Sequence, residues 1–479
     1  MIVGELRHGQ LAIIDRLRET VRLSEGLTDN GALTEPAKLR ALECLSRFGE
    51  RLRDMRASRV RTAGTSTLRR ASDSKAFRKD AEQALGHPID VISGIEEARL
   101  IYNGVTHSLP PTDGLRLVLD IGGGSTELIL GKAAKPSALE SLNMGCVLMT
   151  EKYFVNGDIN EKNFAAARLA AGLKLRPIKA FFRDSLEIEA IGTSGTIIST
   201  EAVARELGII ESSDLLPGVV EKLIEQVLEF GNIADLSLPG LSERRAQVWP
   251  GGLAILVELM EVLRIDGLRI SDGALREGLL YDHLGRLQHE DARERSVQAL
   301  ALRYNVDQAQ AARVGATASR LLAQCEQPWQ LDSSLASMVL QWGTRLHEIG
   351  LDISHSGFQK HGAYIVANAD LPGFPRSEQL FLAFLIATQR QRVDQSILEQ
   401  LPSEWHVPVL RLSILQRLAV LLNRSRSSLE LPEIKVEVGE SSIRLEFPQG
   451  WLDDNPLTIT DLERERNYLG QVGYDLTYA

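Results

Sequence analysis

The stretch DIGGGSTEL, Asp120 to Leu128, places three consecutive glycines between an acidic residue and Ser-Thr-Glu. The apolar run LRLVLD before the glycines has the composition of a buried strand, and TELIL after them reads as a second strand. Glycine lacks a Cβ, so successive amides can approach a ligand closely and point into one concavity. The pattern predicts a β-turn-β loop that binds phosphate. The groups expected to donate hydrogen bonds to the phosphate are three amides and two hydroxyls, those of Gly122, Gly123, Gly124, Ser125 and Thr126.

This loop lacks the usual cation for phosphate. A Walker loop would need a lysine and a following helix, and the stretch has neither. The phosphate charge therefore requires a metal ion, which predicts Mg²⁺ as the cofactor. Asp120 is the expected ligand, directly or through water, and Glu127 is expected to assist. A glycine turn can also be purely structural, because glycine motifs match loosely.

Two further turns of small residues follow strand-like segments. GTSGT, residues 192–196, comes after EIEAIG and opens a helix, whose N-terminus favours anions. SDGALREG, residues 271–278, has the same context. Three such turns in one chain predict a phosphate-binding cleft. In the second turn the expected phosphate contacts are Gly192, Thr193, Ser194 and Gly195.

The whole chain of 479 residues is too long for one core. Strand and helix patterns alternate up to about residue 288, and residues 68–85 read as one helix within this part. From residue 291 to about 426 the apolar residues then recur at helical spacing. In IKVEVGESSIRLEF apolar and polar residues alternate, which predicts a small β-hairpin. We expect boundaries near residues 113, 288 and 428. The resulting parts are 1–113, 114–288, 289–428 and 429–479.

Composition narrows the class of protein. The chain has 44% apolar and 25% charged residues, as soluble globular proteins do. A net charge of -10 argues against nucleic-acid binding, so an anionic substrate must meet local positive charge. Three widely spaced cysteines, no secretory pattern and no uninterrupted apolar span predict a cytoplasmic protein without an integral membrane segment. Peripheral contact with the inner membrane is left open.

The order and spacing of several motifs resemble the exopolyphosphatase / guanosine pentaphosphate phosphatase family over essentially the whole chain. They include TAGTSTLRRASD, VISGIEEARLIYNGV, DIGGGSTEL, AIGTSGT, ISDGALREGLLYD and HEIGLDISHSGFQKHGAYIVANADLPGF. That family belongs with acetate and sugar kinases, actin and heat-shock ATPases. The resemblance implies an α/β fold of two ribonuclease-H-like lobes around a cleft. An all-α HD-like domain and a homodimer are also implied, and the alternating tail is expected to add a small C-terminal β unit.

The resemblance assigns roles to individual residues as well. Glu97 matches the catalytic carboxylate, which would orient and deprotonate the attacking water. Glu96 lies about 100° from Glu97 around a helix and is expected to face solvent. Arg69 resembles the arginine that contacts the substrate phosphate. From the residues alone, the two glutamates would be partners of a helix dipole and Arg69 a surface arginine.

Two features depart from the family pattern. The first phosphate loop, Asp-x-Gly-Ser-Asn-Ser, is expected immediately before Met1 and is not in the chain. A start assigned at an internal methionine is favoured over a genuine truncation. In the helical part, His347-Glu348 stands where a His-Asp pair is expected, and His355 and His361 are followed by no clear further histidine. We therefore expect a helical domain with hydrogen-bonded histidines rather than a metal site.

The predicted function is that of an exopolyphosphatase, which releases orthophosphate from the end of inorganic polyphosphate. Hydrolysis of the 5′ terminal phosphate of guanosine pentaphosphate (pppGpp) to give ppGpp is a close alternative, and the motifs do not separate the two. A kinase is compatible with the fold, although no base-recognition pattern is visible. A non-catalytic binder of polyphosphate or alarmone follows if the first phosphate loop is truly absent.

Overall fold

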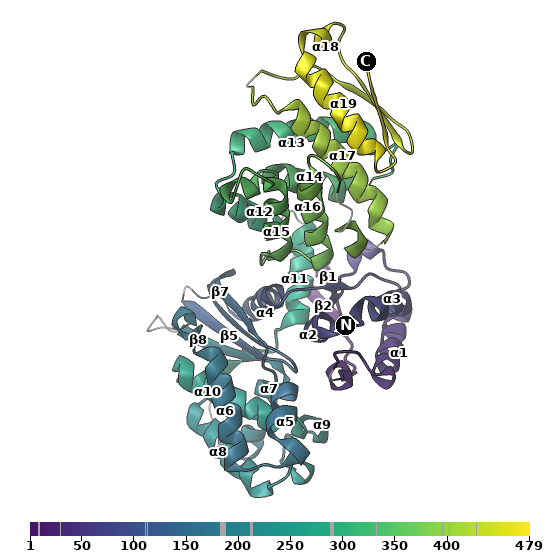
Figure 1. Cartoon of the computed structure of the whole chain (residues 1–479). Helices are drawn as coiled ribbons and strands as arrows, with labels where there is room; N and C mark the ends of the chain where they lie inside the picture. The colour runs from purple at the N-terminus through teal and green to yellow at the C-terminus, as the bar shows by residue number, and fades with distance from the viewer. Residues whose placement is uncertain are drawn as a thin grey trace. The chain divides into compact units, whose positions relative to one another are not determined.

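The computed structural model consists of two compact units, Met1–Glu290 and Asp291–Ala479 (Figure 1). It describes all residues except 8–9, 29, 111, 113, 183–187, 211–213, 288–291, 332, 394–396, 402 and 428. The predicted boundaries at 113, 288 and 428 lie outside the described residues, so the finer division into four parts stays a prediction. Among the described helices, none combines the length and the hydrophobicity needed to cross a lipid bilayer.

The main sheet of the first unit has six strands in the order β7-β6-β5-β8-β10-β9. Strand β5 is antiparallel to β6 and parallel to β8, and β10 is parallel to β8. The carboxyl ends of β5, β8 and β10 therefore share one edge, and this brings the three predicted turns together. The strands are β5 (Leu115–Ile121), β6 (Thr126–Lys132), β7 (Lys135–Leu142), β8 (Ile188–Thr193), β9 (Asp214–Leu215) and β10 (Leu268–Ile270).

Helices cover both faces of this sheet, and the alternation of side chains along β5 explains why. Leu117 and Leu119 belong to the core that contains α10, whereas Val118 between them belongs to a separate core with α4. A strand buried on both faces is an apolar run, as LRLVLD is. The helices are α4 (Gly94–Ser108), α5 (Cys146–Tyr153), α6 (Glu161–Leu175), α7 (Ser194–Glu206), α8 (Pro217–Phe230), α9 (Glu243–Ala246), α10 (Trp249–Leu263) and α11 (Leu275–Leu287).

The N-terminal part of this unit contains two separate two-stranded sheets. Strands β1 (Ile2–Arg7) and β2 (Gln10–Arg16) are antiparallel, and β3 (Ala63–Gly64) and β4 (Asp90–Val91) are parallel. No strand in the described residues joins the two pairs. The helices here are α1 (Glu35–Leu52), α2 (Ser66–Arg70) and α3 (Ser74–Leu85).

The single helix predicted over residues 68–85 is wrong, because two helices, α2 and α3, occupy this segment. The backbone of Ala71 is extended and ends α2. The carboxylate of Asp73 accepts a hydrogen bond from the amide of Leu33 at 3.1 Å and pairs with Lys38 at 3.0 Å. These contacts hold the segment between the helices against the start of α1, which competes with continuous helix formation.

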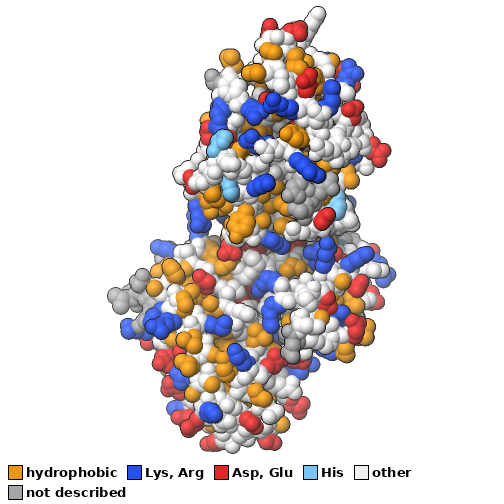
Figure 2. Space-filling view, in the orientation of Figure 1, with side chains coloured by type: hydrophobic (Ala, Val, Ile, Leu, Met, Phe, Trp, Pro, Cys, Tyr) orange, Lys and Arg blue, Asp and Glu red, His pale blue; other side chains and the backbone are white. Residues whose placement is uncertain are grey.

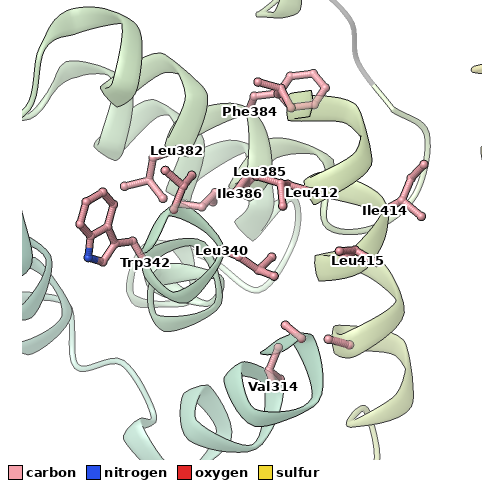
Figure 3. Close-up of a cluster of buried hydrophobic side chains, with 14 of the residues drawn as sticks. Val314, Leu340, Trp342, Leu382, Phe384, Leu385, Ile386, Leu412, Ile414 and Leu415 are labelled. Atoms are coloured by element: carbon pink, nitrogen blue, oxygen red, sulfur yellow. The ribbon is translucent and has the colours of Figure 1, made fainter. Parts of the chain in front are cut away.

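The second unit is a helical domain followed by a small β unit, as predicted. Side chains from α13, α14, α16 and α17 belong to one apolar core, in which Leu385 of α16 lies near Leu412 of α17 (Figure 3). The hairpin of β11 and β12 gains a third strand, β13, parallel to β12. The elements are α12 (Ala292–Arg303), α13 (Gln308–Cys325), α14 (Ser333–Leu346), α15 (Phe358–Asn368), α16 (Arg376–Thr388), α17 (His406–Leu422), β11 (Lys435–Val438), β12 (Ser442–Glu446), α18 (Trp451–Asp454), α19 (Pro456–Gly470) and β13 (Asp475–Tyr478).

Candidate active site

The glycine turn between β5 and β6 has a row of free backbone donors. The amide of Gly122 closes the turn by donating to the carbonyl of Ser125 at 2.9 Å. The carbonyls of Gly122 and Gly123 accept from the first amides of α5, so the turn also caps that helix. Within the described residues, the amides of Gly123, Gly124 and Ser125 have no acceptor. Three consecutive unpaired N–H groups at a strand end form a nest for an anion.

The two hydroxyls predicted beside this nest have other partners. Thr126 is fully buried and its Oγ1 donates to the carbonyl of Met144 at 2.6 Å. The side chain of Ser125 hydrogen-bonds to Glu127. Both hydroxyls thus stabilise the turn and its carboxylate, and the anion donors that the structure leaves free are amides.

The second and third turns are tied to the first. The amide of Ile121 donates to Oγ of Ser194 at 3.2 Å, and Oγ1 of Thr193 donates to the carbonyl of Gly273 at 3.0 Å. Ser194 begins α7 with a φ of 89°, a left-handed conformation that costs energy for any residue except glycine. The hydroxyl of this strained serine joins the ends of β5 and β8, so the spacing of the first two turns is fixed.

A cavity of about 880 Å³ lies against these turns in the first unit. Gly122, Gly123 and the segment Thr193–Gly195 form part of its wall. A Cβ placed on Gly195 would lie 2.0 Å from Nη2 of Arg245, so this guanidinium packs directly on the second turn. The arginines that line the cavity are Arg18, Arg22, Arg244, Arg245 and Arg276.

Local positive charge at this cavity contrasts with the acidic protein as a whole. Figure 2 shows basic and acidic side chains interspersed over the viewed face. Three acidic residues also line the cavity, but Glu19 pairs with Arg47 and Glu25 pairs with Arg22. In the described part of the chain, the other four cavity arginines make no ion pair. The cavity therefore offers the local positive charge that an anionic substrate needs.

Glu97 lies in the first turn of α4 and is 8% exposed. Nη1 of Arg69 donates to its Oε2 at 2.9 Å and to the carbonyl of Ile92 at 2.8 Å. The hydroxyl of Thr65 also hydrogen-bonds to the carboxylate. Burial raises the pKa of Glu97 above its ordinary value, although Arg69 and Thr65 act in the opposite direction. A carboxylate with raised basicity and a fixed orientation suits the proton transfer expected of Glu97.

The expectation that Glu96 faces solvent is wrong. Glu96 is 1% exposed, and both of its oxygens accept from Arg99, at 2.7 and 2.8 Å. Arg99 also donates to Asp282 on α11 at 2.5 Å. Glu96 is buried because α11 packs on this side of α4 and supplies a paired, desolvated site, which spacing around a single helix cannot predict.

Asp120 and Glu127 are directly opposite each other on β5 and β6. Burial, followed by the charge of Glu97, raises the pKa of Asp120 to about 7. Burial, then the charges of Glu97 and Asp120, raises the pKa of Glu127 well above its ordinary value. Ser141 donates to Glu127 at 2.8 Å. Three buried carboxylates thus repel one another, and only Glu97 has an arginine partner among the described residues.

This donor set fits a divalent cation. Oxygen ligands are those that Mg²⁺ prefers, and no hydrogen bond engages the carboxylate of Asp120 in the described residues. A cation would supply the countercharge that the three carboxylates lack. Within the described residues, no group of three or more His, Cys, Asp or Glu side chains has the arrangement of a complete protein metal site. A metal here would thus need water or substrate oxygens as further ligands.

Sequence reasoning missed three side chains that the structure brings to the turns. Nη1 of Arg70 and Oγ of Ser66 would lie 3.5 and 2.8 Å from a Cβ on Gly124, and Arg245 packs on Gly195. Arg70 follows the predicted Arg69 in the chain, and a short helix brings both to the site. The position of Arg245 depends on a separate helix, α9, and no local pattern indicates it.

In the second unit, His347 is buried and its Nδ1 hydrogen-bonds to the carbonyl of Thr344 at 2.6 Å. Burial lowers the pKa of His347. The neighbouring Glu348 forms an ion pair with Arg426, which also pairs with Asp307 at 2.9 Å. These contacts connect the ends of α13, α14 and α17.

Comparison with known proteins identifies the family. The profile of the "Ppx/GppA phosphatase family" matches residues 2–287, and "Ppx/GppA phosphatase, domain III" matches residues 292–466. The chain therefore belongs to the Ppx/GppA phosphatase family, which confirms the resemblance inferred from the motifs. It is 38% identical over 483 residues to a guanosine-5′-triphosphate,3′-diphosphate pyrophosphatase of Vibrio cholerae, an alignment that covers the whole chain and 95% of that protein.

Solved structures confirm the fold class. A family member from Aquifex aeolicus has a TM-score of 0.50 and 25% identity, with 60% of this chain and 94% of that chain covered. An exopolyphosphatase from Cytophaga hutchinsonii has a TM-score of 0.53 and 23% identity, with 59% and 93% covered. The first unit therefore has the predicted two-lobed α/β fold, and a helical domain and a small β unit follow it.

Proposed function

We propose that this protein is a phosphohydrolase that removes the 5′ terminal phosphate of pppGpp and produces ppGpp. The Vibrio cholerae relative, which is similar along the whole chain, supports this substrate over the polyphosphate predicted from the motifs. The observation that carries the proposal is the composition of the cavity wall, which combines arginines with apolar side chains.

A guanosine nucleotide matches this wall better than polyphosphate does. Phe48, Ile198, Val147 and Val248 line the cavity together with the arginines. A purine base has an apolar face that can pack against such side chains, whereas polyphosphate has no apolar part. The nucleotide also carries phosphates at both its 5′ and 3′ positions, and the arginines lie both at the second turn and elsewhere on the wall.

In the proposed mechanism, the amides of Gly123 and Gly124 hold the terminal phosphate, and Arg69 holds the carboxylate of Glu97 in place. The N-terminal turn of α7, with Thr193 to Gly195, holds the neighbouring phosphate. Glu97 orients a water molecule in line with the bond to be broken and takes its proton. The raised basicity of Glu97 helps this transfer, and burial of the carboxylate keeps it in one orientation.

Asp120 and Glu127 would hold Mg²⁺, whose chemistry when bound is to neutralise charge on the phosphate oxygens. The role of these two side chains is to present hard oxygen ligands at the end of β5 and the start of β6. Ser141 and Ser125 orient Glu127 for this task through their hydrogen bonds.

The test is to incubate the purified protein and Mg²⁺ with pppGpp and with polyphosphate, and to measure orthophosphate and ppGpp. We expect release from pppGpp at the higher kcat/KM. Glu97→Gln should bind pppGpp and release phosphate at least about 100-fold more slowly, since it removes a general base. Glu161→Gln, which changes an exposed glutamate on α6, is the matched control and should behave as wild type.

Other outcomes would select other functions. A higher kcat/KM for polyphosphate would refute the nucleotide assignment in favour of exopolyphosphatase activity. Tight Mg²⁺-dependent binding without turnover would indicate a non-catalytic binder, and transfer of labelled phosphate to an acceptor would indicate a kinase. Phosphate release by Glu97→Gln near the wild-type rate would refute the role of Glu97.

A further inference from the structure

The short helix α2 and the residue before it present two pairs of polar side chains at i, i+4 spacing, Thr65 with Arg69 and Ser66 with Arg70. The first pair contacts Glu97, and the second lies against Gly124 of the glycine turn. The segment therefore extends from the proposed base to the proposed phosphate nest. The family resemblance assigns a role only to Arg69.

The first pair fixes the position of Glu97. Nη1 of Arg69 is shared between Oε2 of Glu97 and the carbonyl of Ile92, which lies two residues before the start of α4. The guanidinium thereby links the carboxylate of Glu97 to the backbone just before α4, the helix that carries Glu97. Lysine could not reproduce this arrangement, because its side chain is one bond shorter and its nitrogen would fall short of the position that Nη1 occupies between the two oxygens.

The second pair lies where an anion would bind. The side chain of Arg70 is exposed, and it makes no hydrogen bond or ion pair within the described residues. Its Nη1 and Oγ of Ser66 approach Gly124, whose amide has no acceptor in the same part of the chain. An unpaired guanidinium and a hydroxyl beside free amides together form a site for a phosphate oxygen.

We propose that the two adjacent arginines have different functions: Arg70 is a second phosphate-binding residue of the active site, and Arg69 is the positioning residue of Glu97. This inference rests on the proposed phosphohydrolase function. It predicts that changes at Arg70 alter affinity for phosphate groups, whereas changes at Arg69 alter turnover. The charge at position 70 matters, and the shape of the guanidinium matters at position 69.

The experiment compares Arg70→Ala, Arg70→Lys and Arg69→Lys in the full-length protein, with Arg59→Ala as a control at another exposed arginine. Calorimetry measures binding of methylenediphosphonate, a non-hydrolysable probe, in Mg²⁺, and steady-state kinetics with pppGpp give kcat and KM. Thermal melting confirms that each variant is folded. We expect Arg70→Ala to weaken binding of the probe about 10- to 100-fold, the usual effect of a lost charge-assisted hydrogen bond.

Arg70→Lys should recover most of the affinity, and kcat should stay within about 3-fold of wild type in both Arg70 variants, since uniform binding affects KM. Arg69→Lys should bind the probe nearly normally and lose kcat about 30-fold or more, because the base is misplaced. Probe binding by Arg70→Ala equal to that of Arg59→Ala would overturn the proposal. The proposal would also be overturned if Arg70→Lys and Arg69→Lys changed kcat and the affinity for the probe in the same way. Absence of phosphate release by wild type would refute the phosphohydrolase function, while the calorimetry would still decide the role of Arg70.

Discussion

Replacing Asp120 with asparagine should stabilise the metal-free protein at pH 8 and abolish its activity. Burial and the nearby charge of Glu97 raise the pKa of Asp120 from 3.8 to about 7. A difference of about three pH units corresponds to about 4 kcal/mol by which folding disfavours the ionised carboxylate. This figure is an upper bound, because the folded protein can relax around the charge. Asparagine has a similar shape and cannot ionise, so it avoids this cost.

The direction in which the free energy of unfolding changes with pH follows from where the proton is bound. Between about pH 4 and pH 7 the folded protein keeps a proton on Asp120 that the unfolded chain has lost. The free energy of unfolding therefore falls as pH rises through this window and stays low above it. Asp120→Asn should therefore be only slightly more stable than wild type near pH 4, and the difference in stability should be greatest at pH 8. Mg²⁺ should reverse the order of stability at pH 8, because only wild type retains the charged carboxylate that binds the cation strongly.

Hydrogen exchange of peptides from β5 and β6, measured in EDTA at pH 5 and pH 8, gives the local free energy of opening. Asp80→Asn, at an exposed position on α3, is the control and should show no such pH dependence. The reasoning fails if Asp120→Asn is no more stable than wild type at pH 8, or if its advantage does not grow between the two pH values. Equal stabilisation of both proteins by Mg²⁺ would refute Asp120 as a metal ligand.

Three further substitutions test the packing, the strained turn and the cavity. Gly278→Ala would place a Cβ 1.7 Å from the carbonyl oxygen of Leu100, so α4 and α11 must separate. Urea titration should show a loss of about 1–3 kcal/mol in the free energy of unfolding. Wild-type stability of this variant would contradict the close helix contact. Ser194→Ala should be about 1 kcal/mol less stable than Ser194→Gly. Both variants lose the hydrogen bond from the amide of Ile121, but only alanine keeps the strain of a positive φ. The reverse order of stability in urea titration would refute this argument. Phe48→Ala should raise the KM for pppGpp about 10-fold, as the loss of an apolar contact does, and should leave polyphosphate hydrolysis unchanged. Equal effects on both substrates in steady-state assays would contradict the packing of the purine base on this side of the cavity.

Local patterns were enough to predict the glycine turn and the strands around it. LRLVLD and TELIL form β5 and β6, because an apolar run suits a strand that is covered on both faces. The anion nest also follows from local sequence, although its free amides are those of Gly123, Gly124 and Ser125, because the amide of Gly122 closes the turn. The turns meet because β5, β8 and β10 are neighbours. That adjacency required an assumption about topology, which the family resemblance supplied.

Contacts between distant segments account for what the sequence did not reveal. The burial of Glu96 depends on Arg99 and on Asp282, which lies on a helix remote in sequence. Arg245 reaches the second turn from α9, and no spacing connects the two. Substrate preference depends on the same kind of information, because the arginines and apolar residues of the cavity come from many elements. Periodicity describes one element at a time, so it identifies the turn but not the wall opposite it.

The two adjacent glutamates of α4 show how the fold can give identical side chains different chemistry. Both are buried, but Glu96 has a fully engaged arginine that also pairs with Asp282. Glu97 shares one nitrogen of Arg69 with a backbone carbonyl and is close enough to Asp120 to raise the pKa of that carboxyl. Desolvation without full charge compensation raises basicity at Glu97, whereas both oxygens of Glu96 are occupied by Arg99. The assignment of Glu97 as the base therefore rests on incomplete pairing as well as on position. The reach of Nη1 of Arg69 to the carboxylate and to the carbonyl of Ile92 should accordingly matter for turnover beyond its charge.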